Sequence, residues 1–167
     1  FLETILQNRA KGAYTLRTSH LARPSLCQSV VTGAVASSGY LAAMEIDMRL
    51  THNRYDDRVF WGGYLTANSG CQKLLGVLLI YVVGTIVATV YRMLLPLLPT
   101  WPGPLLGALF VETENMLRFP TVELMSRLNP AVRRGQLPNL WTWKYFWVEA
   151  FRHAAFGGLV GLLVKRR

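Results

Sequence analysis

The sequence has few charged side chains, few cysteines and none of the short motifs that mark common enzyme sites. Charged residues make up 16% of the 167 residues, well below the roughly 25% of soluble domains. It contains no Gly-rich phosphate loop, no paired-cysteine motif and no His-Glu-x-x-His zinc motif. The stretch "SSGY" around Gly39 lacks the flanking glycine of a nucleophile elbow. We therefore expect a protein that is not an enzyme.

The two cysteines exclude a disulfide framework. Cys27 lies at the start of the first long apolar run, and Cys71 lies just before the second. If each run crosses a membrane, the two thiols lie on opposite sides of it. We therefore expect that they do not pair with each other.

Long uncharged runs are the main feature that the sequence does have. No charged residue occurs in the ranges 24–44, 74–91 and 93–111. Each run is close to the ~20 residues that a bilayer-spanning helix needs. These runs predict an all-α, polytopic membrane protein with four transmembrane helices in a compact bundle. The expected helices are residues 25–49, 72–95, 102–126 and 143–164.

Turn residues separate these helices. "PLLPTWPGP" holds four prolines in nine residues and cannot continue a regular helix. "LTHNRYDDRVFWGGYLTANSG" and "LNPAVRRGQLPN" are rich in polar residues and glycine, so we predict loops there. The apolar part of the third helix before Glu112 is short, and a tilted or re-entrant segment is the alternative reading.

Aromatic residues gather near the expected membrane boundaries. The start of the last helix is surrounded by four aromatic residues, Trp141, Trp143, Tyr145 and Trp147. Trp101 lies in the turn between the second and third helices. Such rings prefer the headgroup region. We therefore expect Trp101 and the Trp141 cluster at opposite boundaries.

The net charge is +9, which in a soluble protein would suggest nucleic-acid binding. Here the basic residues flank the apolar runs, as residues 165–167 do after the last one. Basic flanks anchor helices at lipid headgroups. We therefore expect membrane lipids and other membrane-protein subunits as partners, and no nucleic acid. Basic residues lie on both sides of the expected membrane, so they do not fix the orientation.

Residues 1–23 form a basic segment ahead of the transmembrane domain, which we assign to residues 24–167. The apolar residues that share one side of a helix in this segment are Phe1, Leu2, Ile5 and Leu6. This spacing allows an amphipathic helix on the membrane surface. The alternatives are a solvated basic tail and the remnant of a targeting sequence.

Each expected helix carries a pair of small residues at i and i+4. The pairs are Gly33/Ser37, Gly84/Ala88, Gly103/Gly107 and Gly157/Gly161. In lipid, small residues let helix backbones approach closely, and packing drives their association. The alternative is the ordinary glycine and alanine content of membrane helices.

Acidic residues lie inside three of the four expected helices. Glu114 and Arg118 are four residues apart and share a helix face, as do Glu45 and Arg49. In a four-span bundle, the ends of helices one and three lie on the same side as the start of helix four. A charge in lipid costs at least ~2.5–3.5 kcal/mol, so inward pairing is expected. The predicted polar cluster, in one leaflet and open to water on one side, is Glu45, Arg49, Glu112, Glu114, Arg118, Glu149, Arg152 and His153.

Three interpretations of this cluster stay open. Ion pairs that only hold helices together fit a non-catalytic accessory or scaffolding subunit of a larger membrane complex, such as an energy-converting one. A proton or small-solute conductor would use Glu114, Glu149 and His153. A pigment- or haem-binding subunit would use His153 as the ligand, beside glycines that leave room for a flat macrocycle. We favour the first interpretation, with no cofactor.

The stretch "HNRYDD" is the strongest hydrophilic constellation. His52 and Asp56 are four residues apart, and Asp57 follows. A metal site there needs a further donor and a helical loop. We favour a solvated loop whose acids offset Arg54 and Arg58, with no metal bound.

From the first apolar run onward, the chain resembles small uncharacterised bacterial four-helix inner-membrane proteins of the YagU-like kind. The residues that carry the resemblance are "AAMEIDMRLTHNR", "GVLLIYVVGTIVATVYRMLLP", "WPGPLLGALF" and "FRHAAFGGLVGLL". The chain departs from that pattern at "VETEN" and at "HNRYDD". The resemblance implies a four-helix fold in the bacterial inner membrane and no catalytic residue. The mitochondrial inner membrane is the alternative location.

Overall fold

The computed structural model describes residues 26–165, and within that range it contains helices and no strand. The helices are α2 (Leu26–Thr51), α3 (Asp57–Leu65), α4 (Ser69–Leu94), η1 (Leu95–Leu97), α5 (Gly103–Leu128), α6 (Pro130–Arg133) and α7 (Trp143–Leu163). The prediction of an all-α fold is confirmed. The predicted N-terminal segment, residues 1–23, lies outside the described residues.

The four long helices α2, α4, α5 and α7 follow the four apolar runs, and each observed end lies within three residues of the predicted one. Local capping explains several of these ends. The Asn68 side chain accepts hydrogen bonds from the backbone N–H groups of Gly70 and Cys71 at the start of α4. Thr142 accepts one from Tyr145 at the start of α7.

The prediction of a loop throughout residues 50–70 is wrong, because α3 lies within it. Asp56 caps this helix by accepting a hydrogen bond from the backbone of Arg58. Two glycines allow α3 to lie directly on α4. A Cβ atom at Gly62 would come within 1.9 Å of the Gln72 carbonyl oxygen, and one at Gly76 within 2.0 Å of the Arg58 carbonyl oxygen. The helix therefore depends on a tertiary contact that its own sequence does not reveal.

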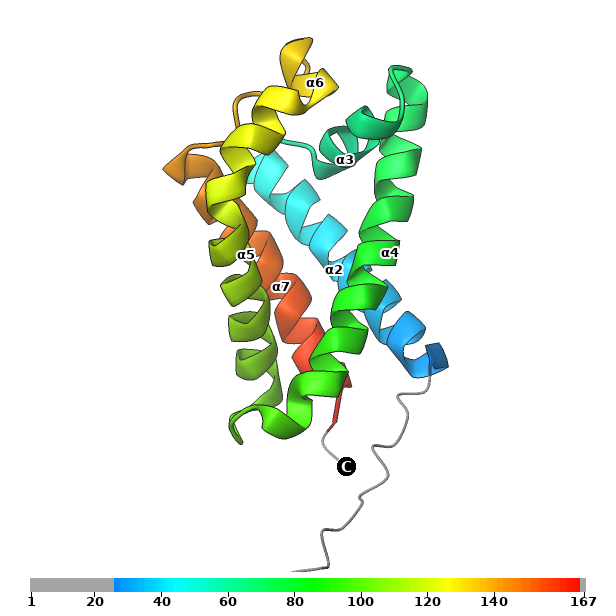
Figure 1. Cartoon of the computed structure of the whole chain (residues 1–167), viewed down its shortest axis with the longest axis vertical. Coiled ribbons are helices and arrows are strands. Elements are labelled where there is room, and N and C mark those ends of the chain that lie inside the picture. The colour runs from blue at the N-terminus through cyan, green and yellow to red at the C-terminus, as the bar shows by residue number, and fades with distance from the viewer. Residues whose placement is uncertain (1–25, 166–167) are drawn as a thin grey trace, which may run out of the picture.

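The long helices form a bundle in which α7 packs against α5 and α2, and α4 packs against α2 and α3 (Figure 1). Helices α4 and α5 make little contact with each other. The short helices α3 and α6 lie together at the upper end, where α2 and α5 finish and α4 and α7 begin (Figure 1). The start of α2 and the end of α7 lie at the lower end.

Glycines bring α5 and α7 together at what we call the glycine contact, made by Gly103, Gly107, Gly157 and Gly161. A Cβ atom at Gly107 would lie 2.1 Å from the Gly157 carbonyl oxygen. A Cβ atom at Gly161 would lie 1.9 Å from the Gly103 carbonyl oxygen. Any larger side chain at these positions would force the two backbones apart.

Helices α2 and α4 meet through the other two small-residue pairs. A Cβ atom at Gly33 would lie 2.5 Å from Thr85 Cα, and one at Gly84 would lie 2.1 Å from Ser37 Oγ. Ala88 is fully buried one turn further along α4. The four pairs named from the sequence thus lie at two helix–helix contacts.

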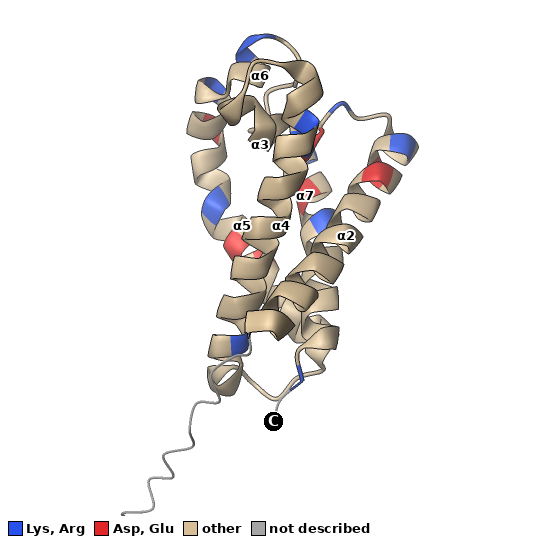
Figure 2. Ribbon diagram, turned by 90° about the vertical axis from the view of Figure 1, so that its right-hand side faces the viewer, with Lys and Arg blue, Asp and Glu red and all other residues tan. Residues whose placement is uncertain are grey.

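Two apolar clusters fill the interior of the bundle. The lower cluster is Ala36, Tyr40, Ala88, Tyr91, Leu95, Leu106, Val111, Phe156, Val160 and Val164. The upper cluster, beneath α3 and α6, is Tyr55, Phe60, Ala131, Leu137 and Leu140. The buried ionisable groups lie between residues of these two clusters. In Figure 2 the acidic segments of the described chain lie in its middle and upper parts, away from the lower end.

Within residues 26–165, one helix is both long and apolar enough to cross a membrane: α4 continued by η1, Ser69–Leu97. Only 22% of its most apolar stretch is buried inside the protein. The core helix of a soluble protein would be mostly buried. Helix α2 carries many small and hydroxyl residues, and α5 carries Glu112, Glu114 and Arg118, which lowers the apolar character of both.

Candidate functional site

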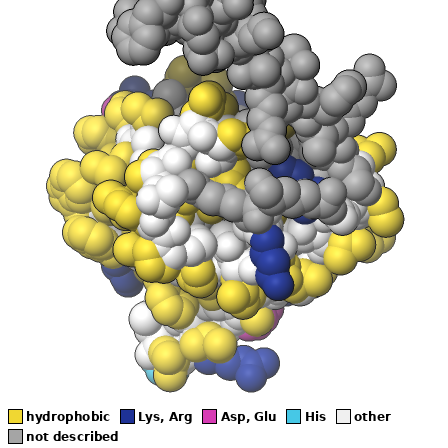
Figure 3. All heavy atoms as spheres, turned by 90° about the horizontal axis from the view of Figure 1, so that it is seen from below, with side chains coloured by type: hydrophobic (Ala, Val, Ile, Leu, Met, Phe, Trp, Pro, Cys, Tyr) yellow, Lys and Arg dark blue, Asp and Glu magenta, His cyan; other side chains and the backbone are white. Residues whose placement is uncertain are grey.

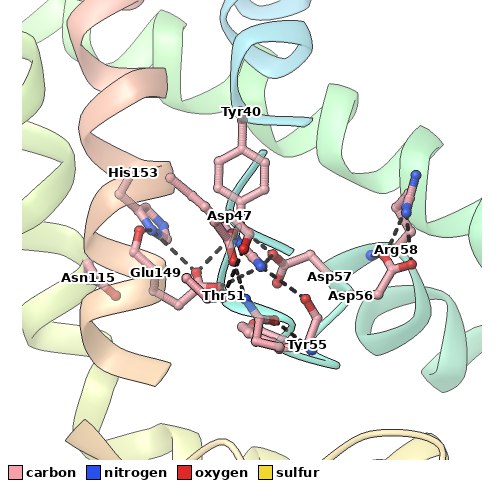
Figure 4. A network of polar contacts seen from close by, with 12 residues as sticks. Tyr40, Asp47, Thr51, Tyr55, Asp56, Asp57, Arg58, Asn115, Glu149 and His153 are labelled. Atoms are coloured by element: carbon pink, nitrogen blue, oxygen red, sulfur yellow. Dashed lines mark hydrogen bonds and ion pairs between the residues drawn. The ribbon is translucent and has the colours of Figure 1, made fainter. Parts of the chain in front are cut away.

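Arg152 of α7 is the centre of a buried ion-pair network, and Figure 4 shows its partners Asp47, Asp57 and Glu149. Its Nε donates to Asp47 of α2, and its Nη1 pairs with Asp57 of α3. Its Nη2 donates to the Tyr55 carbonyl oxygen at 3.0 Å, and the guanidinium lies 4.9 Å from the centre of the Tyr55 ring. Arg152 is 0% exposed. One side chain therefore holds α2, α3 and α7 together, with two carboxylates around one cation.

The turn between α2 and α3 is folded around Asp47. The side-chain amide nitrogen of Asn53 donates a hydrogen bond to the Asp47 carboxylate. It also donates to Thr51 Oγ1 at 2.8 Å. The side-chain oxygen of Asn53, Oδ1, accepts a hydrogen bond from the Tyr55 backbone N–H at 2.9 Å. His52 takes a positive φ of 49°, which reverses the chain at this point. These contacts bury a turn whose sequence is mostly polar.

Asp57 opens α3, where the helix dipole favours a carboxylate. The Tyr40 hydroxyl donates to its Oδ2 at 2.8 Å. Burial, and next the neighbouring Glu149 carboxylate, raises the pKa of Asp57, although Arg152 acts in the opposite direction. Burial also raises the pKa of Tyr55 well above its ordinary value.

A second arginine, Arg118 of α5, extends the network. Its Nε lies 3.3 Å from Glu114 Oε1, and its Nη2 lies 3.4 Å from Glu149 Oε2 of α7. Glu149 Oε1 lies in turn 3.6 Å from Arg152 Nη1. Glu149 thus connects the two arginines. We call the connected residues Tyr40, Asp47, Asp57, Glu114, Arg118, Glu149, Arg152 and His153 the polar layer.

His153 lies at the edge of this layer. Its Nδ1 lies 2.8 Å from the Glu149 backbone carbonyl oxygen, one turn earlier in α7. Its Nε2 lies 3.6 Å from Glu114 Oε2, and its ring meets the Tyr40 ring edge-on at 5.7 Å (Figure 4). A macrocycle coordinated at Nε2 would have to displace Glu114, which gives the pigment or haem interpretation no support.

Five members of the predicted cluster lie in the polar layer: Glu114, Arg118, Glu149, Arg152 and His153. The predicted pairing of Glu45 with Arg49 is wrong, because Arg58 of α3 reaches Glu45 at 2.7 Å while Arg49 is exposed. Glu112 accepts a hydrogen bond from Asn115 at 3.3 Å on its own helix.

The predicted cluster did not include Tyr40, Asp47 or Asp57. A signal for two of them was present. Gly33, Ser37, Tyr40, Met44 and Asp47 follow each other at alternating intervals of four and three, and all five are buried. This inward stripe of α2 continues the small-residue face and ends on Asp47. Glu45 lies off that stripe.

The prediction that "HNRYDD" is a solvated loop is also wrong, because Asn53, Asp56 and Asp57 are buried. Asp56 does pair with Arg58, whose Nε lies 2.8 Å from its Oδ1. In the described part of the chain, no group of three or more His, Cys, Asp or Glu side chains is arranged to hold a metal ion.

The polar layer is closed at its centre, which differs from the predicted opening to water. Arg152 and Asp57 are 0% and 1% exposed. The exposed edge of the layer is Glu114, whose side chain is partly accessible. Solvent therefore reaches the ionisable side chains at the rim of the layer and not at its centre.

A cavity of about 190 Å³ adjoins the polar layer and is partly open. The four long helices and α3 contribute to its wall, which consists of Tyr40, Trp61, Leu79, Ile80, Val83, Gly84, Val87, Val111, Glu114, Arg118, Glu149, His153 and Phe156. Most of the wall is apolar, with the ionisable groups gathered on one part of it.

Comparisons of the chain with protein-family models, with curated proteins and with solved structures found no match.

Proposed function

We propose that the chain is an integral membrane protein whose four long helices all cross the bilayer, and that it acts as a non-catalytic accessory subunit of a larger membrane complex. The observation that carries this proposal is the distribution of side chains in the long helices. The ion pairs of the polar layer point inward, and large apolar side chains point outward. The resemblance described above favours the bacterial inner membrane, with the mitochondrial inner membrane as the alternative.

The outward apolar surface extends over all four long helices. On α4 the side chains of Leu74, Leu78, Val82 and Ile86 are all exposed and form one stripe. The other helices contribute exposed residues such as Val31, Leu105, Leu109, Met116, Phe151 and Leu162. Figure 3, seen from below, shows hydrophobic side chains around much of the outline of the bundle. Contiguous apolar surface of this extent is typical of contact with lipid or with other proteins.

The lengths of the helices fit a bilayer. Helices α2, α4 and α5 have 26 residues each. At 1.5 Å per residue they are about 39 Å long, against about 30 Å of hydrocarbon core, which allows for tilt. The exposed Trp101 follows the lower turn, and the exposed Trp143 and Trp147 begin α7 at the other end. Two aromatic belts at opposite ends support this arrangement.

Helices α2 and α5 have less apolar composition for reasons that fit a membrane bundle. The small and hydroxyl residues of α2, such as Gly33 and Ser37, are buried against α4. The charge of Arg118 in α5 meets Glu114 on its own helix and Glu149 on α7. Inward pairing is what makes intramembrane charges tolerable.

The accessory role is favoured over conduction by what lies below the polar layer. The lower apolar cluster packs Ala88, Tyr91, Leu106 and Val160 across the bundle beneath the ionisable groups. A proton or solute moving from Glu114 toward the lower end would have to pass through this packing. A closed layer of ion pairs above an apolar core instead fits a scaffold.

Cysteine labelling tests the four-span arrangement. Cys27 and Cys71 are both exposed, near the starts of α2 and α4, which lie at opposite ends of the bundle. In sealed membrane vesicles, a membrane-impermeant maleimide should label one cysteine, and permeabilisation should expose the other. Cys27→Ser and Cys71→Ser variants identify which one reacts. If α4 alone crosses, Cys27 precedes the span and Cys71 lies at its start, so both would react from the same side, which would refute the four-span proposal.

Native purification tests the accessory role. Extraction in a mild detergent, followed by mass spectrometry of the co-purifying chains, should identify other membrane subunits in fixed stoichiometry. A chain that stays solitary under native conditions contradicts the proposal. Proton or solute flux into proteoliposomes that disappears in both Glu114→Gln and Glu149→Gln would favour the conductor instead.

A further inference from the structure

The cavity beside the polar layer has a mostly apolar wall and one polar end. At that end, hydrogen-bond acceptors lack donors and negative charge exceeds positive charge. Its apolar wall includes Leu79, Val83 and Val87 of α4, together with Val111 of α5 and Phe156 of α7. The polar groups come from α2, α5 and α7 and include His153, Glu114 and Glu149. Such a concave, mostly apolar space with a few convergent polar groups is typical of small-molecule sites.

The contacts of His153 define its tautomer. A backbone carbonyl oxygen can only accept, so the Nδ1 atom 2.8 Å from the Glu149 carbonyl must carry a hydrogen. In the neutral ring, Nε2 is then an acceptor. It faces Glu114 Oε2, another acceptor, at 3.6 Å, which is longer than a hydrogen bond. Two acceptors that face each other at this distance leave a place for a donor to bond to both.

Glu149 supplies a second acceptor that is not fully used. This residue is 8% exposed, yet its Oε1 accepts no hydrogen bond in the described structure and has Arg152 Nη1 at 3.6 Å. The Tyr40 hydroxyl donates to Asp57 at 2.8 Å and lies 3.4 Å from Glu149 Oε2, so it leaves Glu149 Oε1 without a donor. Buried acceptors without donors are costly, and a ligand that brings donors would lower that cost.

The charges around the cavity favour a cation over an anion. The charged side chains in its wall are the carboxylates of Glu114 and Glu149 and the guanidinium of Arg118. Arg118 lies within 3.4 Å of both carboxylates, so two acids share one cation. An ammonium group would reduce this excess of negative charge, whereas a carboxylate or phosphate would increase it.

We propose that this cavity binds a small apolar amine, with its ammonium group between His153 Nε2 and Glu114 and its apolar body against α4. An ammonium nitrogen at about 2.9 Å from both atoms forms two ordinary hydrogen bonds. A cavity of about 150 Å³ holds benzene in a known case. The cavity here, about 190 Å³, therefore suits one ring with a short aminoalkyl chain. This inference goes beyond the accessory role and does not depend on it.

Benzylamine and benzyl alcohol form the test pair, because they share a ring and differ in charge. Calorimetric titration of the purified full chain in detergent should show saturable one-to-one binding of benzylamine. Binding of benzyl alcohol should be at least tenfold weaker. Glu114→Gln should weaken benzylamine binding at least tenfold and leave benzyl alcohol nearly unchanged, because only the ammonium group uses the carboxylate.

Two further variants keep the result interpretable. Glu123→Gln, on the exposed face of the same helix, where Glu123 pairs with Arg127, should leave benzylamine binding unchanged. Val83→Trp fills the cavity from the apolar side and should abolish binding of both compounds. The proposal is overturned if benzylamine binds no better than benzyl alcohol, if Glu114→Gln has no effect, or if uptake never saturates. Solitary purification without partners would leave this proposal intact, so the two proposals fail separately.

Discussion

The polar layer and the glycine contact hold the same helix, α7, in opposite ways. In its first half, Glu149 and Arg152 meet charged partners from α2, α3 and α5. In its second half, Gly157 and Gly161 meet α5 through backbone alone. Because the glycines repeat every four residues, a slip of one turn would still bring one glycine of each helix together. The same slip would separate Arg118 from Glu149. The comparison indicates that glycines provide proximity while the ion pairs fix the register.

Removal of the central cation should have the largest effect. Arg152→Met leaves Asp47 and Asp57 buried without a counter-charge, and loss of one partner of a buried pair costs about 3–5 kcal/mol. Thermal unfolding of the purified protein in detergent measures this. The control is Arg127→Met, which breaks an exposed pair with Glu123 and should cost about 1 kcal/mol or less. Equal melting temperatures for the two variants would contradict the role given to the polar layer.

Alanine substitutions at two adjacent glycines distinguish the effect of close helix packing on stability from the effect of helix propensity. Gly157→Ala places a methyl group 2.4 Å from the Gly107 carbonyl oxygen and should destabilise the protein by about 1–3 kcal/mol. The nearest atom to a methyl group at Gly158 is 3.9 Å away. Gly158→Ala should therefore be neutral or stabilise by up to about 1 kcal/mol, since alanine favours helix. If both variants behave alike in thermal unfolding, the backbone contact between α5 and α7 is not what holds this half.

The smallest expected effect is a pH dependence of the polar layer. The pKa of Asp57 is raised in the folded protein, chiefly by burial. Its contribution to stability is therefore complete below its ordinary pKa of 3.8 and is lost as the pH rises through the raised value. The stability of the wild type relative to Asp57→Asn should therefore fall as the pH rises above 3.8. A difference that grows over this range would show that the ion pair with Arg152 outweighs burial.

The sequence allowed the long helices to be predicted because their signals are local. Apolar runs and the prolines of residues 96–104 each act within a few residues. Helix α3 was missed for the opposite reason. Its glycine pair reads as a loop, and its stability comes from the contact of Gly62 with Gln72 on another helix. The helix exists because of its tertiary neighbour.

The candidate site shows the same difference between local signals, which can be predicted from the sequence, and tertiary contacts, which cannot. The pair of Glu114 and Arg118 has local spacing and was found from it. The partner of Glu45 was assigned by the same rule to Arg49, but Arg58 arrives from a different helix and takes its place. Asp57 was assigned to solvent, because nothing in "HNRYDD" indicates that a buried arginine 95 residues later will bind it. Long-range charge pairing has no local pattern.

The position of Arg152 near the end of the chain also affects how the protein is made. Asp47 and Asp57 precede Arg152 by 105 and 95 residues. At about 5–20 residues per second, the ribosome delivers the arginine roughly 5–20 seconds after the acids. Until then the nascent protein holds two unmatched carboxylates around the turn between α2 and α3. The addition of α7 neutralises them and completes the bundle, so a chain interrupted before α7 would remain open to chaperones and proteases.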